Sequence, residues 1–222
     1  MLSAENLFLK GRHSALLPPT SLEANAGGLL LVSGDDQSTR TALALALSGR
    51  MRPTSGTVSW GHSARLEHLR RHSALIDSPG VNEPERHLRV RDLVAEDLAL
   101  VPRRKRPRGN AADWLKSEGL SDLGPRWIEE LEPAVRLDLL TRLALADFTV
   151  ELLVFDSPDR HDADPDTWLS VLTGSVASPS RLVTAVAVVA QIPPEWTGPA
   201  AAAGAVDTNV ASRSANTEEV PA

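Results

Sequence analysis

The feature that most constrains the fold is an apolar run that ends at a glycine and is followed by a polar loop and a helix-forming segment. The run is Leu29–Ser33, and Gly34 begins the loop, which passes through Arg40 and Thr41 into a segment rich in alanine and leucine. This order is typical of a buried strand, a phosphate-binding loop and the helix behind it. The pattern predicts a nucleoside triphosphate as the ligand class.

The loop departs from the phosphate-loop pattern G-x-x-x-x-G-K-[ST] at two positions, because Thr39 replaces the second glycine and Arg40 replaces the lysine. Arg40 still offers a cation to phosphate, and Thr41 offers a hydroxyl to Mg²⁺. Asp35 and Asp36 weaken the binding of an anion unless they point outward. On the loop alone, a strand–turn–helix crossover without a ligand carries similar weight. The predicted nucleotide-binding residues are Gly34, Asp35, Gln37, Ser38, Thr39, Arg40, Thr41 and Ala42.

A second apolar run far along the chain supports the phosphate-loop interpretation. Glu151–Phe155 predicts a buried strand, and Asp156 follows it directly. A carboxylate at the end of a strand next to the phosphate loop is the Walker B arrangement, which would hold Mg²⁺ opposite Thr41. The alternative is an aspartate that caps the turn before Pro158. The two motifs together, in this order, are more specific than either one.

Composition limits the other functions of this chain. A chain of 222 residues with a formal net charge of −6 suits one domain with a tail and gives no sign of a nucleic-acid surface. The absence of cysteine excludes disulfides, iron–sulfur clusters and thiol catalysis. We find neither a signal peptide nor an apolar stretch long enough to span a membrane. We therefore expect a cytoplasmic protein that reaches the membrane only through a partner.

The remaining segments predict an α/β fold with a mostly parallel sheet, flanking helices and a small helical subdomain. The expected strands are Leu29–Ser33, Thr57–Trp60, Glu151–Phe155 and Leu182–Val189. The expected helices are Thr41–Met51, the second half of His87–Leu100, and Trp127–Ala146 with Pro133 near its start. From Thr197 onward the sequence is small, polar and aperiodic, which predicts a disordered tail over 197–222.

The order of several segments resembles the ATP-binding subunit of an ABC transporter, over roughly residues 4–195. The segments that carry the resemblance are Ser48–Gly61 after the phosphate loop, Arg86–Leu100 before the helical subdomain, Leu131–Ala146 at the signature helix, ELLVFDSPD at Glu151–Asp159, and ADPDT at Ala163–Thr167. The Arg40-Thr41 pair is similar to that of an actinobacterial subset of these ATPases, which are often paired with large membrane proteins.

The resemblance implies a P-loop NTPase-type domain over 1–196 with a helical subdomain at about 85–146. It further implies ATP and Mg²⁺ as ligands, with Thr41 and Asp156 holding the Mg²⁺. A membrane permease is the implied partner, at the inner face of the cell membrane. The ATP-binding subunits would form a homo- or heterodimer with Asp164 at the interface, and no nucleic acid is involved.

The catalytic positions of the family are replaced in this chain. Ser157 stands where a carboxylate polarises the attacking water, and Gln191 stands near the switch histidine. Glu132–Val135 replaces the serine and glycines of the signature, and Asp77 or Ser78 lies near the expected Q-loop glutamine. Losing a general base typically lowers a rate by ~10²–10⁴. We therefore expect no intact catalytic residues, slow or absent hydrolysis and weak Mg-nucleotide binding.

Two alternatives of other classes stay open. The chain could be a pseudo-ATPase, which acts as a scaffold or a nucleotide-sensing regulator without transport chemistry. It could also be a P-loop-like fold that binds no nucleotide. Nucleotide binding that depends on Thr41 and Asp156 argues against the fold that binds no nucleotide, and co-purification with a membrane protein favours the transporter subunit over the pseudo-ATPase.

Overall fold

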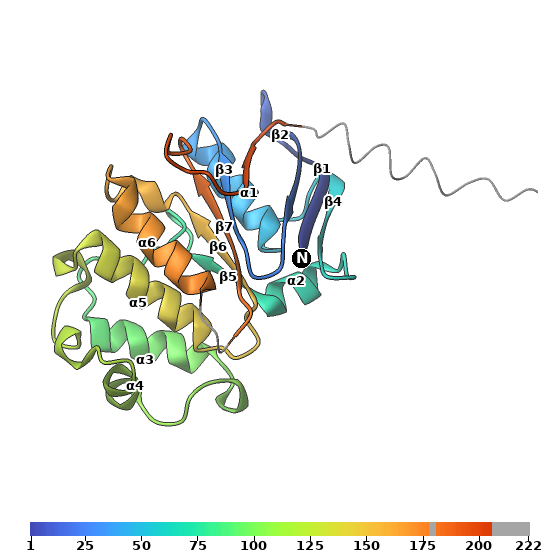
Figure 1. Ribbon diagram of the computed structural model, residues 1–222. Coiled ribbons are helices and arrows are strands. Elements are labelled where there is room, and N and C mark those ends of the chain that lie inside the picture. The colour runs from blue at the N-terminus through green and yellow to red at the C-terminus, as the bar shows by residue number, and fades with distance from the viewer. Residues whose placement is uncertain (178–180, 206–222) are drawn as a thin grey trace, which may run out of the picture.

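In the part of the chain that the structure describes, the larger of two β-sheets is a parallel sheet of five strands in the order β5-β6-β7-β3-β8 (Figure 1). The computed structural model describes residues 1–177 and 181–205. The strands of this sheet are β3 (Leu29–Ser33), β5 (Ser73–Ile76), β6 (Leu152–Asp156), β7 (Thr184–Val189) and β8 (Ala200–Ala202). Buried apolar residues fill β6 and β7, as expected for strands covered on both faces. The predicted α/β class with a parallel sheet is confirmed.

The smaller sheet is antiparallel, with the order β2-β1-β4. Its strands are β1 (Leu2–Lys10), β2 (Ala15–Ala24) and β4 (Ser55–Trp60). Helix α1 (Gln37–Leu47) lies between the two sheets (Figure 1). One apolar core joins side chains of this sheet, α1 and one face of the parallel sheet, to which Leu30 and Val32 contribute.

Four helices of the described residues share an apolar core on the opposite face of the parallel sheet (Figure 1). They are α3 (Val90–Leu100), α4 (Ala111–Ser117), α5 (Pro133–Leu145) and α6 (Pro165–Val176). Leu29 and Leu31 of β3 point to this second core, because successive side chains of a strand face opposite sides. Side chains of β3 therefore contribute alternately to the two cores.

Short elements complete the described part of the chain. They are α2 (Leu66–His72) and the 3₁₀ turns η1 (Arg103–Lys105), η2 (Ser121–Leu123), η3 (Ile128–Glu130) and η4 (Pro158–Arg160). Within the described residues, no helix combines the length and the apolar character that crossing a membrane requires.

The bounds of helix α1 correct the predicted helix Thr41–Met51. The helix begins at Gln37, and the N–H of Arg40 donates to the carbonyl of Asp36 at 3.0 Å. It ends at Leu47 because Gly49 has φ 71°, a left-handed conformation that suits glycine at a helix end. The second half of the predicted phosphate loop is therefore the first turn of a helix.

The C-terminal segment also differs from its prediction. Residues from Thr197 were expected to be disordered, but Ala200–Ala202 form β8, which pairs in parallel with Leu31–Ser33 of β3. A strand of three alanines has no apolar pattern from which it could be predicted. It forms because it pairs with the neighbouring strand β3. The rest of the predicted tail, 206–222, lies outside the described residues.

Candidate functional site

The candidate site lies at the carboxyl edge of the parallel sheet, where β5, β6 and β3 end. Asp77 follows β5, Asp156 is the last residue of β6, and Gly34 follows β3. Because parallel strands end at the same edge, residues far apart in sequence meet here, which is where open α/β sheets bind ligands.

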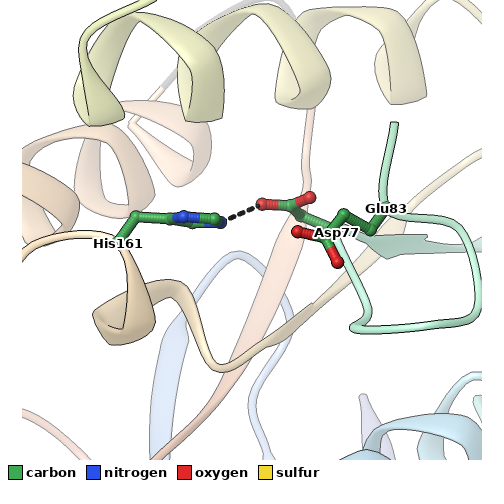
Figure 2. Close-up of side chains that lie close together, drawn as sticks. All are labelled: Asp77, Glu83 and His161. Atoms are coloured by element: carbon green, nitrogen blue, oxygen red, sulfur yellow. Dashed lines mark hydrogen bonds and ion pairs between the residues drawn. The ribbon is translucent and has the colours of Figure 1, made fainter. Parts of the chain in front are cut away.

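Asp77 is the centre of a buried polar cluster at the end of β5. Its side chain is nearly inaccessible, and its φ of 54° is left-handed, which is uncommon for aspartate. The imidazole Nε2 of His161 lies 2.9 Å from its Oδ2, and Glu83 lies beside it, as Figure 2 shows. Asp77 is one of the two residues, with Ser78, that the sequence places near the expected Q-loop glutamine.

Two guanidiniums neutralise this cluster. Arg136 of α5 lies 2.5 Å from Oδ1 of Asp77, and Nη2 of Arg160 lies 3.1 Å from the same atom and 3.3 Å from Oε1 of Glu83. Burial alone would raise the pKa of Asp77. The hydrogen bonds from His161 and Arg136 and the charges of both arginines outweigh it and lower that pKa to about 2.

Asp77, Glu83 and His161 could offer three ligand atoms to a metal, because these atoms lie within 4.8 Å of one another. The two guanidiniums, however, already contact the same carboxylates. A divalent cation here would meet two fixed positive charges. We therefore assign the cluster a structural role.

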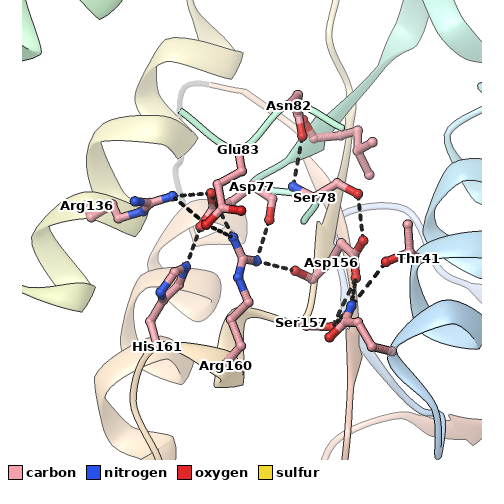
Figure 3. A network of polar contacts seen from close by, with 12 residues as sticks. Thr41, Asp77, Ser78, Asn82, Glu83, Arg136, Asp156, Ser157, Arg160 and His161 are labelled. Atoms are coloured by element: carbon pink, nitrogen blue, oxygen red, sulfur yellow. Dashed lines mark hydrogen bonds and ion pairs between the residues drawn. The ribbon is translucent and has the colours of Figure 1, made fainter. Parts of the chain in front are cut away.

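Asp156 is the centre of a second buried cluster, at the end of β6, which Figure 3 shows beside the first. Only 1% of Asp156 is exposed. Its Oδ2 accepts a hydrogen bond from the hydroxyl of Ser78 at 2.6 Å. Its Oδ1 accepts from the hydroxyl of Ser157 at 3.0 Å and from Nε2 of Gln37 at 3.2 Å.

Gln37 connects the phosphate loop to this cluster. Its Nε2 also lies 3.1 Å from Oγ1 of Thr41 and 2.9 Å from Oγ of Ser157, so three oxygens share its two N–H groups. The two residues predicted to hold Mg²⁺, Thr41 and Asp156, therefore do converge. They converge on an amide nitrogen.

Arg40, at the lysine position of the loop, forms hydrogen bonds with neighbouring residues of the protein. Its Nη1 donates to the carbonyls of Gly34 at 2.8 Å and Asp35 at 2.7 Å. Its Nη2 donates to Oε1 of Gln37 at 3.0 Å, and its Nε donates to Oγ of Ser157 at 3.0 Å. The guanidinium thus closes the loop onto itself.

The other loop residues divide between core and surface. Gly34 and Ala42 are buried, whereas Asp35 and Ser38 are exposed. The hydroxyl of Thr39 donates to the carbonyl of Leu16 in β2 at 3.0 Å, which ties the start of α1 to the antiparallel sheet. Thr39 thus has a structural contact where the loop pattern has a glycine.

The chemistry of the loop fits a phosphate better than it fits Mg²⁺. The N–H groups of the first helical turn have no partner within α1, and they could receive an anion. Thr41 and Asp156 are suitable Mg²⁺ ligands, but the amide nitrogen of Gln37 lies between them and can only donate. With Gln37 in this position, Mg²⁺ does not fit.

The predicted catalytic positions have other surroundings. Ser157 is buried, has φ 52° and is engaged by Arg40, Gln37 and Asp156. Gln191 is exposed beyond the end of β7. Neither offers a carboxylate or an imidazole that could activate a water molecule.

The predicted dimer contact and the signature segment both lie at helix starts. Asp164 is exposed and caps α6, where its Oδ1 accepts from the N–H of Asp166 at 3.1 Å. Glu132 is the N-cap residue of α5 but makes no side-chain cap, and Pro133 is the first residue of that helix. A role of Asp164 at a dimer interface stays a prediction.

Sequence reasoning missed the bridging role of Gln37, the contact of Ser78 with Asp156, and the pairing of Arg160 and His161 with Asp77. The pattern indicates which residues stand at strand ends, but not where their side chains point. Arg160 and His161 carry one signal that was available. Both follow shortly after Asp156, which the sequence placed at the end of a buried strand.

No family model matches this chain, and no curated protein matches it. Solved structures do match. The dimeric structure of a bacterial ABC transporter cassette aligns with a TM-score of 0.66 at 15% identity, covering 93% of this chain and 97% of that one. A nucleotide-free ATP-binding cassette from an ABC transporter aligns with a TM-score of 0.62 at 16% identity, covering 85% and 81%.

A third match is CbiO1 from Clostridium perfringens, part of the ABC transporter complex CbiONQ. It aligns with a TM-score of 0.61 at 15% identity, covering 86% of this chain and 78% of that one. At such identities the likeness is one of fold. The chain has the fold of an ABC transporter ATP-binding cassette.

Proposed function

We propose that this protein is the ATP-binding subunit of an ABC-type transporter, in which it binds nucleotide weakly and hydrolyses it slowly or not at all. The observation that carries the proposal is the convergence of Thr41, from the phosphate-loop helix, with Asp156, from the end of β6. That convergence supports a nucleotide site at the sheet edge, on a fold shared with ATP-binding cassettes.

Impaired hydrolysis is supported by the hydrogen bonds of Ser157. Its hydroxyl accepts from Arg40 and Gln37 and donates to Asp156, so all its hydrogen-bonding capacity is used within the protein. A serine with these contacts has no group left to orient a water molecule. Loss of such a base typically lowers the rate by ~10²–10⁴.

A membrane permease is the proposed partner, and a cavity at the edge strand β5 supports it. The cavity has a volume of about 400 Å³ and lies between α3 and α5. Its lining includes the apolar residues Leu75, Leu93 and Leu140 and the charged residues Arg50 and Arg70. Leu100, at the end of α3, also lines it and is 82% exposed. The exposed side chain of Leu100 is thus available to a partner that enters the cavity.

Under this proposal the protein is cytoplasmic, is held at the inner face of the membrane by the permease, and works as a dimer. The solved structures similar to it include a dimeric cassette and a component of a transporter complex. Asp164, exposed at the start of α6, is the proposed interface residue.

A pseudo-ATPase scaffold is the second candidate, because the guanidinium of Arg40 forms its hydrogen bonds with the protein itself. Four hydrogen bonds hold that side chain against Gly34, Asp35, Gln37 and Ser157. A cation held in this way is less available to phosphate than a free lysine. In this case the fold and the partner surface would remain without the chemistry.

Two measurements on the purified protein test the proposal. A fluorescent ATP analogue should bind at high micromolar to millimolar concentration, and Thr41→Ala should weaken its binding. Phosphate release should stay far below that of an active cassette measured in parallel. Release at an equal rate contradicts impaired hydrolysis, whereas binding that is unchanged in Thr41→Ala contradicts the site. Co-purification with a membrane protein favours the transporter subunit over the scaffold.

A further inference from the structure

The orientation of the Gln37 amide is fixed by its partners. Its Oε1 faces Nη2 of Arg40 at 3.0 Å, and its Nε2 faces Oδ1 of Asp156 at 3.2 Å. A guanidinium can only donate and a carboxylate can only accept, so exchanging the two amide atoms would break both contacts. The nitrogen of Gln37 therefore points at Asp156.

The Asp156 carboxylate has a full set of donors without any metal. The hydroxyls of Ser78 and Ser157 and the amide of Gln37 donate to its two oxygens. Three donors satisfy a buried carboxylate, which otherwise carries a large desolvation penalty. This shell leaves Asp156 with no need of a counter-ion.

The spacing of the oxygens suits an amide nitrogen. Oxygen atoms of Thr41, Asp156 and Ser157 lie 2.9–3.2 Å from Nε2 of Gln37. Mg²⁺ requires oxygen ligands at about 2.0–2.1 Å. The three oxygens would have to contract around the ion, and the side chain of Gln37 would have to leave.

We propose that Gln37 takes the place of the divalent cation in this site, so that nucleotide binding does not depend on Mg²⁺. The proposal rests on the proposed function in one respect, which is that this sheet edge is the nucleotide site. Arg40 supports it, because it holds Oε1 of Gln37 and so keeps Nε2 turned toward Asp156 and Thr41. Gln37 is thus a positioning residue that excludes the metal.

The variant Gln37→Glu tests this proposal without nucleotide. It replaces the donor nitrogen by an oxygen close to Oδ1 of Asp156, and two such carboxylates repel each other unless a cation lies between them. Mn²⁺ alone is the probe. We expect saturating Mn²⁺ to raise the Tm of Gln37→Glu by about 5 °C and to leave the Tm of the native protein unchanged.

The matched control is the double variant Gln37→Glu/Asp156→Asn, which lacks the second carboxylate and should not respond to Mn²⁺. It also accounts for any binding by Asp77, Glu83 and His161, which all three proteins retain. A folded Gln37→Glu protein that does not respond overturns the proposal. So does native protein that Mn²⁺ stabilises, if Asp156→Asn abolishes the effect.

If Gln37→Glu does not fold, the native protein and Asp156→Asn decide the question by electron paramagnetic resonance of bound Mn²⁺. If the native protein and Asp156→Asn bind equal amounts of Mn²⁺, the proposal is supported. If the native protein binds more Mn²⁺ than Asp156→Asn, the proposal is overturned.

A nucleotide titration separates this proposal from the proposed function. A fluorescent ATP analogue should bind the native protein equally well in Mg²⁺ and in EDTA, whereas Gln37→Ala should bind it more tightly in Mg²⁺. Tighter binding to the native protein in Mg²⁺ overturns the proposal. Absence of any nucleotide binding contradicts the proposed function, and the Mn²⁺ comparison then still decides the role of Gln37.

Discussion

The guanidinium of Arg136 lies 2.5 Å from the carboxylate of Asp77, and this contact joins helix α5 to the end of strand β5. Both side chains are buried. Arg160, which follows Asp156, contacts the same carboxylate. One aspartate therefore ties the helices on one face of the sheet to the sheet edge that carries the candidate nucleotide site.

The substitution Asp77→Asn should destabilise the fold by about 3 kcal/mol near neutral pH, because it leaves the buried guanidinium of Arg136 and the partly buried one of Arg160 with one fewer charge partner. The pKa of Asp77 is lowered from 3.8 to about 2, so its contribution is present above pH 4 and is lost as the pH falls through 2. Urea denaturation at pH 7 and pH 3 measures this difference.

Asp138→Asn is the matched control for this prediction. Asp138 also pairs with an arginine, since its Oδ2 lies 2.8 Å from Nε of Arg142, but this pair is partly exposed on one helix. Such pairs contribute about 0–1 kcal/mol. Equal losses in Asp77→Asn and Asp138→Asn would contradict the central role of Asp77.

The carboxylate of Asp97 should destabilise the fold near neutral pH, whereas that of Asp77 stabilises it. Burial, together with the charge of Glu96, raises its pKa from 3.8 to about 6. A raised folded pKa favours folding below pH 4, and this contribution is lost as the pH rises through 6. Asp97→Asn should therefore stabilise the protein above pH 7, by at most about 3 kcal/mol.

Denaturation curves of native protein and Asp97→Asn at pH 4 and pH 7.5 test this prediction. The two proteins should differ little at pH 4 and clearly at pH 7.5. Glu96→Gln removes only the neighbouring charge and should give a smaller gain. If Asp97→Asn loses stability at pH 7.5, Asp97 has a charge partner that the structure does not show.

Continuous apolar runs allowed the central strands to be predicted from sequence. The predicted bounds of β3 match the structure, β6 is shifted by one residue from its prediction, and β7 begins two residues later than predicted. The strands β1 and β2 were missed. Two consecutive prolines, Pro18 and Pro19, lie within β2, and proline is a poor strand signal even though edge strands tolerate it.

The candidate site could be predicted only as far as topology determines it. Parallel strands bring Thr41 and Asp156 to one edge, which follows from the order of motifs. The side chain between them could not be predicted, because the direction of Gln37 depends on where α1 begins. The first turn of α1 also contacts another sheet, because the hydroxyl of Thr39 donates to the carbonyl of Leu16.

Asp35 and Asp36 should weaken nucleotide binding by their charge. Both are exposed, beside the start of α1 where phosphate would bind. The double substitution Asp35→Asn/Asp36→Asn should raise the affinity for a fluorescent ATP analogue by about tenfold at low salt, and the gain should shrink at high salt because exposed charges are screened.

Fluorescence titration at two salt concentrations measures this gain. Asp162→Asn/Asp166→Asn, a double variant near the start of α6, removes the same charge at another place and should not change the affinity. An equal gain in both double variants would indicate net charge rather than position as the cause.

Leu100→Asp should abolish binding of the permease without affecting the fold. Leu100 is 82% exposed at the end of α3 and lines the cavity beside β5, so a charge there disturbs the proposed contact but no core packing. Stability should stay within about 0.5 kcal/mol of the native value. Recovery of the membrane partner with tagged protein should fall by about tenfold or more, as for a central contact residue. Leu182→Asp is the matched control, because Leu182 is 69% exposed and does not line that cavity. Equal recovery with the two variants would place the partner on another surface.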